Sequence, residues 1–133
     1  PFEMKFTAVD GRDVDLAKMK GKVVLIDFWA TWCGPCVAEL PNLKKVYAEL
    51  HGQGFEIIGI SLDKEVKELT DFVASKDMPW AQFCDGEGWK SEIARKHAIG
   101  SIPAMFLVNK EGILVDLDAR DDLEGKIRKY LAE

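Results

Sequence analysis

A chain of 133 residues, 47% of them hydrophobic, can bury one sizeable core without disulfide or metal staples, so we expect a single domain over residues 1–133. Its net charge of −5 repels nucleic acid and anionic membrane surfaces on average, which argues against both as partners. No apolar run approaches the roughly 18 residues of a membrane-spanning helix, and the cysteines are too few for a disulfide-rich scaffold.

The first half of the chain is predicted to contain a buried strand followed by a helix. After a short extended start at residues 2–7, the near-continuous apolar run at residues 22–29 is typical of a strand buried on both faces of a parallel sheet. From Pro35 to Leu50, apolar residues recur at intervals of three and four, which predicts an amphipathic helix. Pro41 should bend this helix, because proline lacks a backbone donor and crowds the preceding turn.

The second half alternates strands and helices, which indicates an α/β fold with a mixed sheet. The predicted elements are a strand at residues 55–62, a helix capped by Asp63 and ending near Lys76, a helix at residues 87–97, strands at residues 105–109 and 113–117, and a last helix from Asp121 or Asp122. The two late strands should form a hairpin through the turn at residues 109–112.

Two cysteines occur where the buried strand passes into the helix. Cys33 and Cys36 are three residues apart, so both side chains should lie on one face of the first turn, at the roughly 5 to 6 Å Cα separation of a disulfide. We expect Cys33 at the exposed end of this turn, where free backbone N–H groups favour a thiolate and lower the pKa. Cys36 should lie deeper, as a second nucleophile that needs a base to take its proton.

A carboxylate interrupts the apolar strand just before the cysteines. Asp27 loses its hydration there, so we expect its pKa to rise towards neutrality and expect the group to act as a base for Cys36. A loop cap or a pair with a buried lysine would explain Asp27 without catalysis, but strand interiors disfavour aspartate. Glu39 follows Cys36 by three residues on the same helix face and is a second candidate proton carrier, although an ordinary solvated glutamate fits the same spacing.

The remaining residues of the types that bind metals do not suggest a metal site. Cys84, His51 and His97 form no second closely spaced pair, so we expect no cofactor beyond a redox-active Cys33–Cys36 disulfide. His51 and His97 are predicted to be solvated cations at helix C-termini. Cys84 is predicted to be a small core residue rather than a reactive thiol.

Two separate motifs resemble those of thioredoxins: residues 27–36, DFWATWCGPC, are similar to the active-site run, and residues 100–104, GSIPA, to the later proline loop. The runs at residues 21–25, GKVVL, and 39–41, ELP, more closely resemble the TlpA/ResA-like thiol-disulfide oxidoreductases of bacterial envelopes. Residues 55–76 fit the extra βα element of that group. The resemblance covers nearly the whole chain and implies a thioredoxin-like three-layer sandwich.

The resemblance also implies roles for individual residues. Pro103 should be cis and packed against the cysteines, with Ile102 offering its backbone N–H and C=O to an extended substrate segment. Trp32 should be exposed beside the sulfurs, and with the Gly34-Pro35 spacer it should contact the substrate. Trp29 should pack inside.

Thioredoxins usually lack a glutamate at the position of Glu39. The envelope group often has this glutamate but no aspartate at the position of Asp27. This chain has both residues. The resemblance therefore leaves open which of the two serves Cys36.

The expected activity is thiol-disulfide exchange. Cys33 would attack a disulfide in a partner protein, and Cys36 would then release the product, leaving the partner reduced and the cysteines oxidised. The Gly34-Pro35 spacer is that of a reductant. The expected partners are a disulfide-containing protein and an upstream thiol donor. We expect a monomer in the cell envelope or periplasm, with the cytoplasm as the alternative.

Two rival functions remain open. A peroxiredoxin-like peroxidase would share the fold, but the usual Pro-x-x-x-Thr-x-x-Cys pattern is absent, since Thr31 lies only two positions before Cys33. A redox-inert docking domain of a larger envelope protein is the second, and the intact cysteine pair argues against it.

Overall fold

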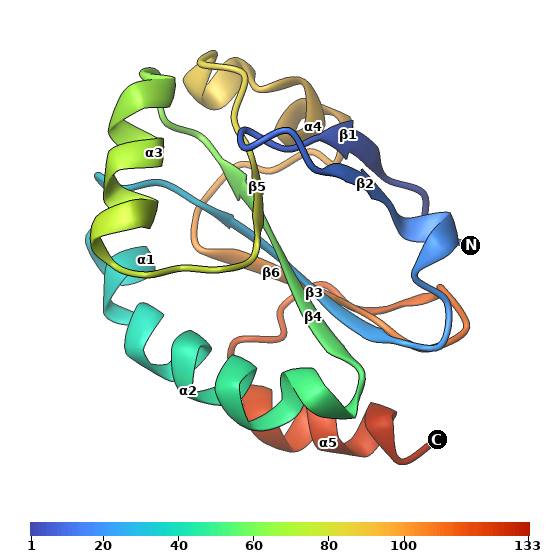
Figure 1. Cartoon of the computed structure of the whole chain (residues 1–133). Coiled ribbons are helices and arrows are strands. Elements are labelled where there is room, and N and C mark those ends of the chain that lie inside the picture. The colour runs from blue at the N-terminus through green and yellow to red at the C-terminus, as the bar shows by residue number, and fades with distance from the viewer.

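A mixed five-stranded sheet forms the centre of the protein, whose computed structural model describes all residues 1–133 (Figure 1). The strands are β3 (Val23–Trp29), β4 (Phe55–Ser61), β5 (Ala81–Phe83), β6 (Ala104–Val108) and β7 (Leu114–Asp116), in the order β5-β4-β3-β6-β7. Strands β3, β4 and β5 are parallel, whereas β6 and β7 are antiparallel to their neighbours. The expected mixed sheet and its late hairpin are therefore confirmed.

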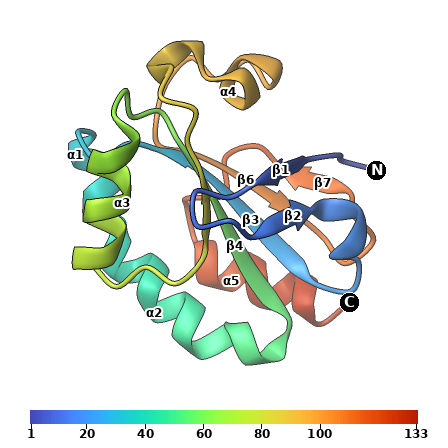
Figure 2. The same ribbon diagram turned by 45° about the horizontal axis from the view of Figure 1, so that its top comes forward.

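Helices cover both faces of the sheet, as Figures 1 and 2 show. The helices are α1 (Gly34–Ala38), α2 (Leu40–Leu50), α3 (Val66–Ser75), α4 (Glu92–Lys96) and α5 (Leu123–Leu131), with 3-10 turns η1 (Leu16–Lys18), η2 (His51–Gln53) and η3 (Gly88–Lys90). Helices α1, α2, α3 and α5 lie on one side, and α4 lies on the other side together with the N-terminal strands. No helix is both long and apolar enough to cross a membrane.

Strand β3 is buried along its whole length, because it has neighbours on both edges and covered faces on both sides. Its side chains alternate between the two faces. Phe28 packs against Phe106 and His97, on the side of α4. Trp29 packs against Phe72 of α3, on the other side. Asp27 has the same parity as Trp29 and points to the face covered by α1, α2 and α3.

The chain bends at Glu39 between α1 and α2 rather than within one long helix. Pro41 is the second residue of α2, a position where the missing backbone donor costs nothing. The predicted distortion near Pro41 is confirmed. It is a break between two helices and not a bend within one helix. The apolar positions Leu40, Leu43 and Leu50 face the core as predicted.

Three short elements differ from the sequence-based expectation. The N-terminal segment forms a hairpin of β1 (Lys5–Thr7) and β2 (Asp13–Asp15), of which only the first strand was expected. The edge strand β5 was not predicted, because three residues are too few for a periodic pattern. The helix predicted at residues 87–97 is interrupted at Ser91, which caps α4 with its side chain.

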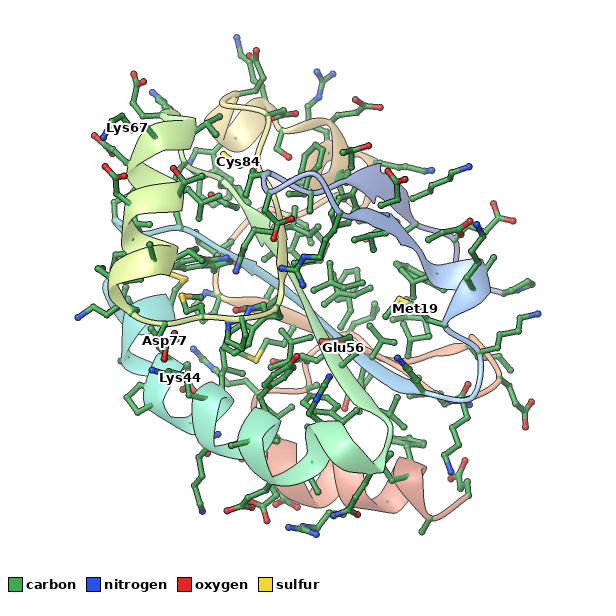
Figure 3. The ribbon with its side chains drawn as sticks, viewed as in Figure 1. Met19, Lys44, Glu56, Lys67, Asp77 and Cys84 are labelled. Carbon is green, nitrogen blue, oxygen red and sulfur yellow. A yellow bond between two sulfur atoms is a disulfide. The ribbon has the colours of Figure 1, made fainter.

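Polar contacts tie the helices on one face together. Arg128 of α5 forms an ion pair with Glu49 of α2 at 3.4 Å. Lys44 of α2 donates to the carbonyl oxygen of Lys76 at 2.7 Å, at the end of α3 and beside Asp77 (Figure 3). These contacts are largely exposed, so they set the relative positions of the helices more than they add stability.

Candidate active site

The predicted cysteine pair forms a disulfide at the start of α1. The Cα atoms of Cys33 and Cys36 are 5.2 Å apart, as the spacing predicted. Cys33 is the N-cap residue of α1, and its Sγ accepts a hydrogen bond from the backbone N–H of Cys36 at 3.3 Å. Pro35 occupies the first turn, where proline is pre-organised for a helix. A hydrogen bond to this sulfur would favour its thiolate once the disulfide is reduced.

The two cysteines are equally buried, so the prediction of an exposed Cys33 is wrong. Cys33 is 6% exposed and Cys36 is 5% exposed. The loop before β6 contributes to this cover, since the carbonyl oxygen of Ile102 lies 3.9 Å from the Sγ of Cys33. Gly34 and Pro35 between the cysteines are exposed.

The peptide bond between Ile102 and Pro103 is cis, as the resemblance implied. The loop stands next to the disulfide, and the backbone of Ile102 is close to the sulfur of Cys33. The two tryptophans also divide as expected: Trp32 is 54% exposed, and Trp29 is buried. An exposed indole and a backbone segment therefore flank the disulfide.

Asp27 is buried in the middle of β3, where it stands opposite Gly59 of β4 and Met105 of β6. Its Oδ1 has no hydrogen-bond partner. Burial and, to a smaller extent, the charge of Glu39 raise the pKa of Asp27 to about 7. The expected rise towards neutrality is confirmed, and the alternative of a buried lysine partner finds no support.

Glu39 links the cysteine helix to α2. It is half-buried, and its backbone N–H donates to the carbonyl oxygen of Cys36 at 3.2 Å. Its charge acts on Asp27, so the two carboxylates belong to one electrostatic group. The two predicted proton carriers are therefore close enough for the charge of one to affect the other.

Asp63 does not cap α3 as predicted; the N-cap of α3 is Glu65. Instead, the buried carboxylate of Asp63 accepts hydrogen bonds from the backbone N–H of Thr31 at 3.2 Å and from its Oγ1 at 2.6 Å. A third donor is the Oγ of Ser61 at 2.5 Å. Asp63 thus anchors the loop that leads into the cysteines. Strands β3 and β4 are adjacent and parallel, so residues following their carboxyl ends could have been expected to meet.

Cys84 is a half-buried thiol on the segment after β5, near the end of α3 that carries Lys67 (Figure 3). Its Sγ lies 3.5 Å from the carbonyl oxygen of Asp63. Burial raises the pKa of the Cys84 thiol, which disfavours the reactive thiolate. The prediction of a packing role agrees with this environment.

Only His51 has the exposed position that was predicted for both histidines. His51 follows α2, and its Nε2 lies 3.4 Å from Oε2 of Glu56. His97 ends α4 but is half-buried among the rings of Phe2, Phe28 and Phe106, and burial lowers its pKa. The prediction of a solvated cation at His97 is therefore wrong. No group of three or more histidine, cysteine or acidic residues is placed to hold a metal ion.

Sequence reasoning missed Trp89, which lies in η3 and is 45% exposed. Its ring centroid is 6.2 Å from that of Trp32. Two exposed indoles thus meet beside the disulfide. The available signal was the position of Trp89, between glycines that favour turns and a serine that can cap a helix. The chain was already expected to have one exposed tryptophan at the active site.

Residues 1–117 match the family model described as AhpC/TSA family. The chain belongs to the AhpC/TSA family. Among curated proteins, it is 32% identical over 127 residues to a thiol-disulfide oxidoreductase ResA of Bacillus cereus, covering 92% of this chain and 72% of that protein. It is 27% identical to the ResA protein of Bacillus subtilis strain 168, over 92% of this chain and 66% of that protein.

Solved structures of thioredoxin-like domains share the fold. The thioredoxin domain of a thiol-disulfide oxidoreductase from Bacteroides vulgatus aligns with a TM-score of 0.84 at 29% identity, over 98% of this chain and 94% of that one. A thiol-disulfide oxidoreductase from Bacteroides fragilis aligns with a TM-score of 0.82 at 25% identity, over 96% of each chain. The protein is a thioredoxin-like oxidoreductase that acts by thiol-disulfide exchange.

Proposed function

We propose that this AhpC/TSA-family protein reduces disulfide bonds in partner proteins through Cys33 and Cys36. The observation that carries the proposal is the Cys33–Cys36 disulfide beside cis-Pro103 and the exposed Trp32. The cysteines themselves are only 6% and 5% exposed, but Trp32, Gly34 and Pro35 next to them are exposed, so a partner reaches the disulfide from the protein surface. A surface site suits a macromolecular substrate better than an enclosed small molecule.

Reduction proceeds in two exchange steps. The Cys33 thiolate attacks one sulfur of the partner disulfide, which forms a mixed disulfide and releases the other partner sulfur as a thiolate. The Cys36 thiolate then attacks the Sγ of Cys33, which frees the second partner sulfur and forms the Cys33–Cys36 disulfide. Two electrons pass to the partner, and an upstream thiol donor returns the pair to the reduced state.

The backbone around the disulfide would hold the partner. We assign Ile102 and Pro103 to pairing with an extended partner segment, because the Ile102 carbonyl lies 3.9 Å from the attacking sulfur. Trp32, Gly34 and Pro35 are exposed next to it and would contact the same segment. Removal of the Trp32 indole should therefore raise KM for protein substrates.

Asp27 is the better candidate for the base that takes the proton of Cys36. Its pKa of about 7 lets it accept a proton near neutral pH, and its Oδ1 has no competing donor. Asp27→Asn should slow release of a preformed mixed disulfide at pH 7 more than Glu39→Gln does, as measured by stopped-flow after the first exchange. If Glu39→Gln slows this step more, Glu39 is the base.

Trapping of partners tests the function itself. A Cys36→Ser variant should accumulate a mixed disulfide through Cys33, because the second exchange is blocked. Partners captured from an extract and released by reductant can then be identified. The matched control is Cys33→Ser, which should capture none. Adducts through Cys84 instead of Cys33 would contradict the assignment of the nucleophile.

The direction of electron flow follows from the Gly34-Pro35 spacer, which is also that of thioredoxin at about −270 mV. We expect a reduction potential well below about −180 mV, the value of protein disulfide isomerase. Equilibration with glutathione buffers measures it. A higher potential would make the protein an oxidant.

The rival functions draw no support from the site. The Thr31 hydroxyl donates its proton to Asp63 at 2.6 Å, so it is not free to donate to a peroxide at Cys33. Peroxide turnover that survives Cys36→Ser would nevertheless favour a peroxidase. A disulfide that fails to exchange with any protein thiol would favour a docking domain.

We place the protein in the cell envelope or periplasm on the resemblance to the envelope oxidoreductases and to ResA proteins. We also propose that residues 1–133 act as one monomeric domain. The two exposed indoles are the main apolar surface beside the site, and a pair of side chains falls far short of the roughly 800 Å² per partner that a stable dimer buries.

A further inference from the structure

Two exposed tryptophans form a pair next to the disulfide. The rings of Trp32 and Trp89 are 6.2 Å apart between centroids and tilted by 54°. Both are about half exposed, whereas Trp29 and Trp80 are buried. Large exposed aromatic side chains that gather at one place typically mark a binding surface rather than an incomplete core.

The segment that carries Trp89 is firmly held. Gly88 has a φ of +58° and packs against the stem of Lys64, so close that an added Cβ would lie 3.1 Å from its Cγ. Asp85 accepts hydrogen bonds from the backbone N–H groups of Glu87 and Glu92, at 3.1 and 2.9 Å. These contacts hold the backbone on both sides of Trp89. The exposure of its indole therefore results from the folded conformation and not from a loose loop.

The position of the pair determines what can cover it. Thiol-disulfide exchange requires a sulfur of the partner to reach Cys33, and Trp32 is the residue directly before Cys33. The residues that flank the reacting cysteine of the partner must therefore pass over or beside Trp32. Trp89 extends this surface away from the cysteines, on the side of η3.

The charges around Trp89 do not favour a charged partner. Three acidic and three basic residues share the neighbouring surface: Asp85, Glu87, Glu92, Lys90, Arg95 and Lys96. Their charges offset one another, so contact with the indoles and not long-range attraction decides what binds. Indole faces gain most from large apolar or aromatic side chains.

We propose that Trp89, together with Trp32, is a specificity-determining residue that selects partner segments with a large apolar or aromatic side chain next to the reacting cysteine. The inference rests on the proposed reduction of protein disulfides and adds a substrate preference to it. Trp89 is a binding residue and takes no part in the exchange chemistry.

Two matched peptide disulfides test the preference. Both are short cyclic peptides closed by one disulfide, one with phenylalanine and the other with serine next to the reacting cysteine. The wild-type protein should reduce the phenylalanine peptide with a kcat/KM about tenfold higher, because a partial ring contact that covers roughly 55 Å² of apolar surface is worth about that factor. Trp89→Ala should lower the ratio clearly, with the remainder due to Trp32, and Trp89→Phe should keep most of it.

Leu117→Ala is the control, because Leu117 is an exposed apolar residue just after β7 at 63% exposure and should keep the wild-type ratio. A wild-type protein that reduces both peptides equally, or a Trp89→Ala variant that keeps the wild-type ratio, overturns the preference alone. A wild-type protein that reduces neither peptide overturns the proposed function instead. Far-UV circular dichroism of each variant checks folding, and Trp89→Phe provides the second test if Trp89→Ala does not fold.

Discussion

Two aspartates near the cysteines are buried but differ in their hydrogen bonding. Asp63 accepts three hydrogen bonds, from two groups of Thr31 and from Ser61, so its carboxylate is satisfied without a cation. Asp27 has an oxygen with no partner, and its pKa rises to about 7. The first arrangement suits a structural anchor, and the second suits a group that exchanges protons.

Burial of Asp27 should make stability depend on pH. Its pKa is about 7 in the folded protein, above the 3.8 of an exposed aspartate, so between these values the folded state binds a proton that the unfolded state lacks. The stabilisation is therefore complete below about pH 4 and is lost as the pH rises to about 7. Asp27→Asn should abolish this loss and be more stable than the wild type at pH 8, by up to about 4 kcal/mol.

Urea unfolding of both oxidised proteins at a series of pH values measures this effect. Their difference isolates Asp27 from other titrating groups, among them His97, whose lowered pKa acts in the opposite direction. A constant difference between pH 4 and pH 8 would contradict the raised pKa of Asp27.

Removal of the Asp63 carboxylate should destabilise the protein. Asp63→Ala leaves the N–H and hydroxyl of Thr31 and the hydroxyl of Ser61 without their acceptor, which we expect to cost about 2–4 kcal/mol in the free energy of unfolding. Thr31→Val removes one of these donors and should cost less. Urea unfolding of the oxidised variants compares them. Equal stability of Asp63→Ala and the wild type would show that water replaces the carboxylate.

At the residue scale, properties that depend on nearby residues were predicted from the sequence, whereas contacts with distant residues were not. The disulfide spacing of Cys33 and Cys36 depends on one helical turn, and the burial that raises the pKa of Asp27 could be predicted from the apolar run around it. His97 is surrounded by the ring of Phe106 and by those of Phe2 and Phe28, and the last two are far away in the sequence. Asp63 satisfies the local pattern of a helix cap, but its donors at Thr31 come from the loop after β3.

At the scale of elements, the close approach of β4 and β5 depends on a glycine. The side-chain amide of Gln82 in β5 lies over Gly59 of β4, so closely that an added Cβ would overlap it. Gln82 is buried and its Oε1 accepts a hydrogen bond from the Nε1 of Trp29 at 3.0 Å. Because Gly59 of β4 has no side chain, the side chain of Gln82 in β5 can cross it and accept the hydrogen bond from Trp29 in β3.

Gly59→Ala should therefore destabilise the protein by about 1–3 kcal/mol, because Gln82 must move and its bond to Trp29 is strained or lost. In a Gln82→Ala background the same substitution should cost much less, since the overlapping amide is absent. A double-mutant cycle from urea unfolding of the four proteins gives the coupling. Equal costs of Gly59→Ala in the two backgrounds would contradict the overlap.

Long elements with strong patterns were predicted, whereas two of the three-residue strands were missed. The buried run of β3 and the amphipathic positions of α2 have the expected periods. Strands β2 and β5 have three residues each; β2 pairs with the equally short β1, and β5 pairs with the longer β4. A residue pattern this short does not separate a strand from a loop, so tertiary contacts decided these two elements.

For the whole molecule, the core is continuous from end to end. The buried apolar residues form one cluster that runs from Met4 near the N-terminus to Ile127 in α5. The hairpin of β1 and β2 also belongs to it, because Val14 is buried and the N–H of Val9 donates to the carbonyl oxygen of Gln82 at 2.9 Å. No segment has a separate core on which it could fold alone.

Residues 1–133 should consequently unfold in a single cooperative transition. Far-UV circular dichroism follows the helices and strands. Fluorescence reports on all four tryptophans, and its largest change on unfolding should come from Trp29 and Trp80, which are buried on the face covered by α2 and α3. The two urea transitions of the oxidised protein should coincide in midpoint and slope. No helix can separate from the sheet without exposing the shared core. A fluorescence change that precedes the loss of secondary structure would instead place α3 and β5 in a less stable unit, and the single-domain proposal would fail.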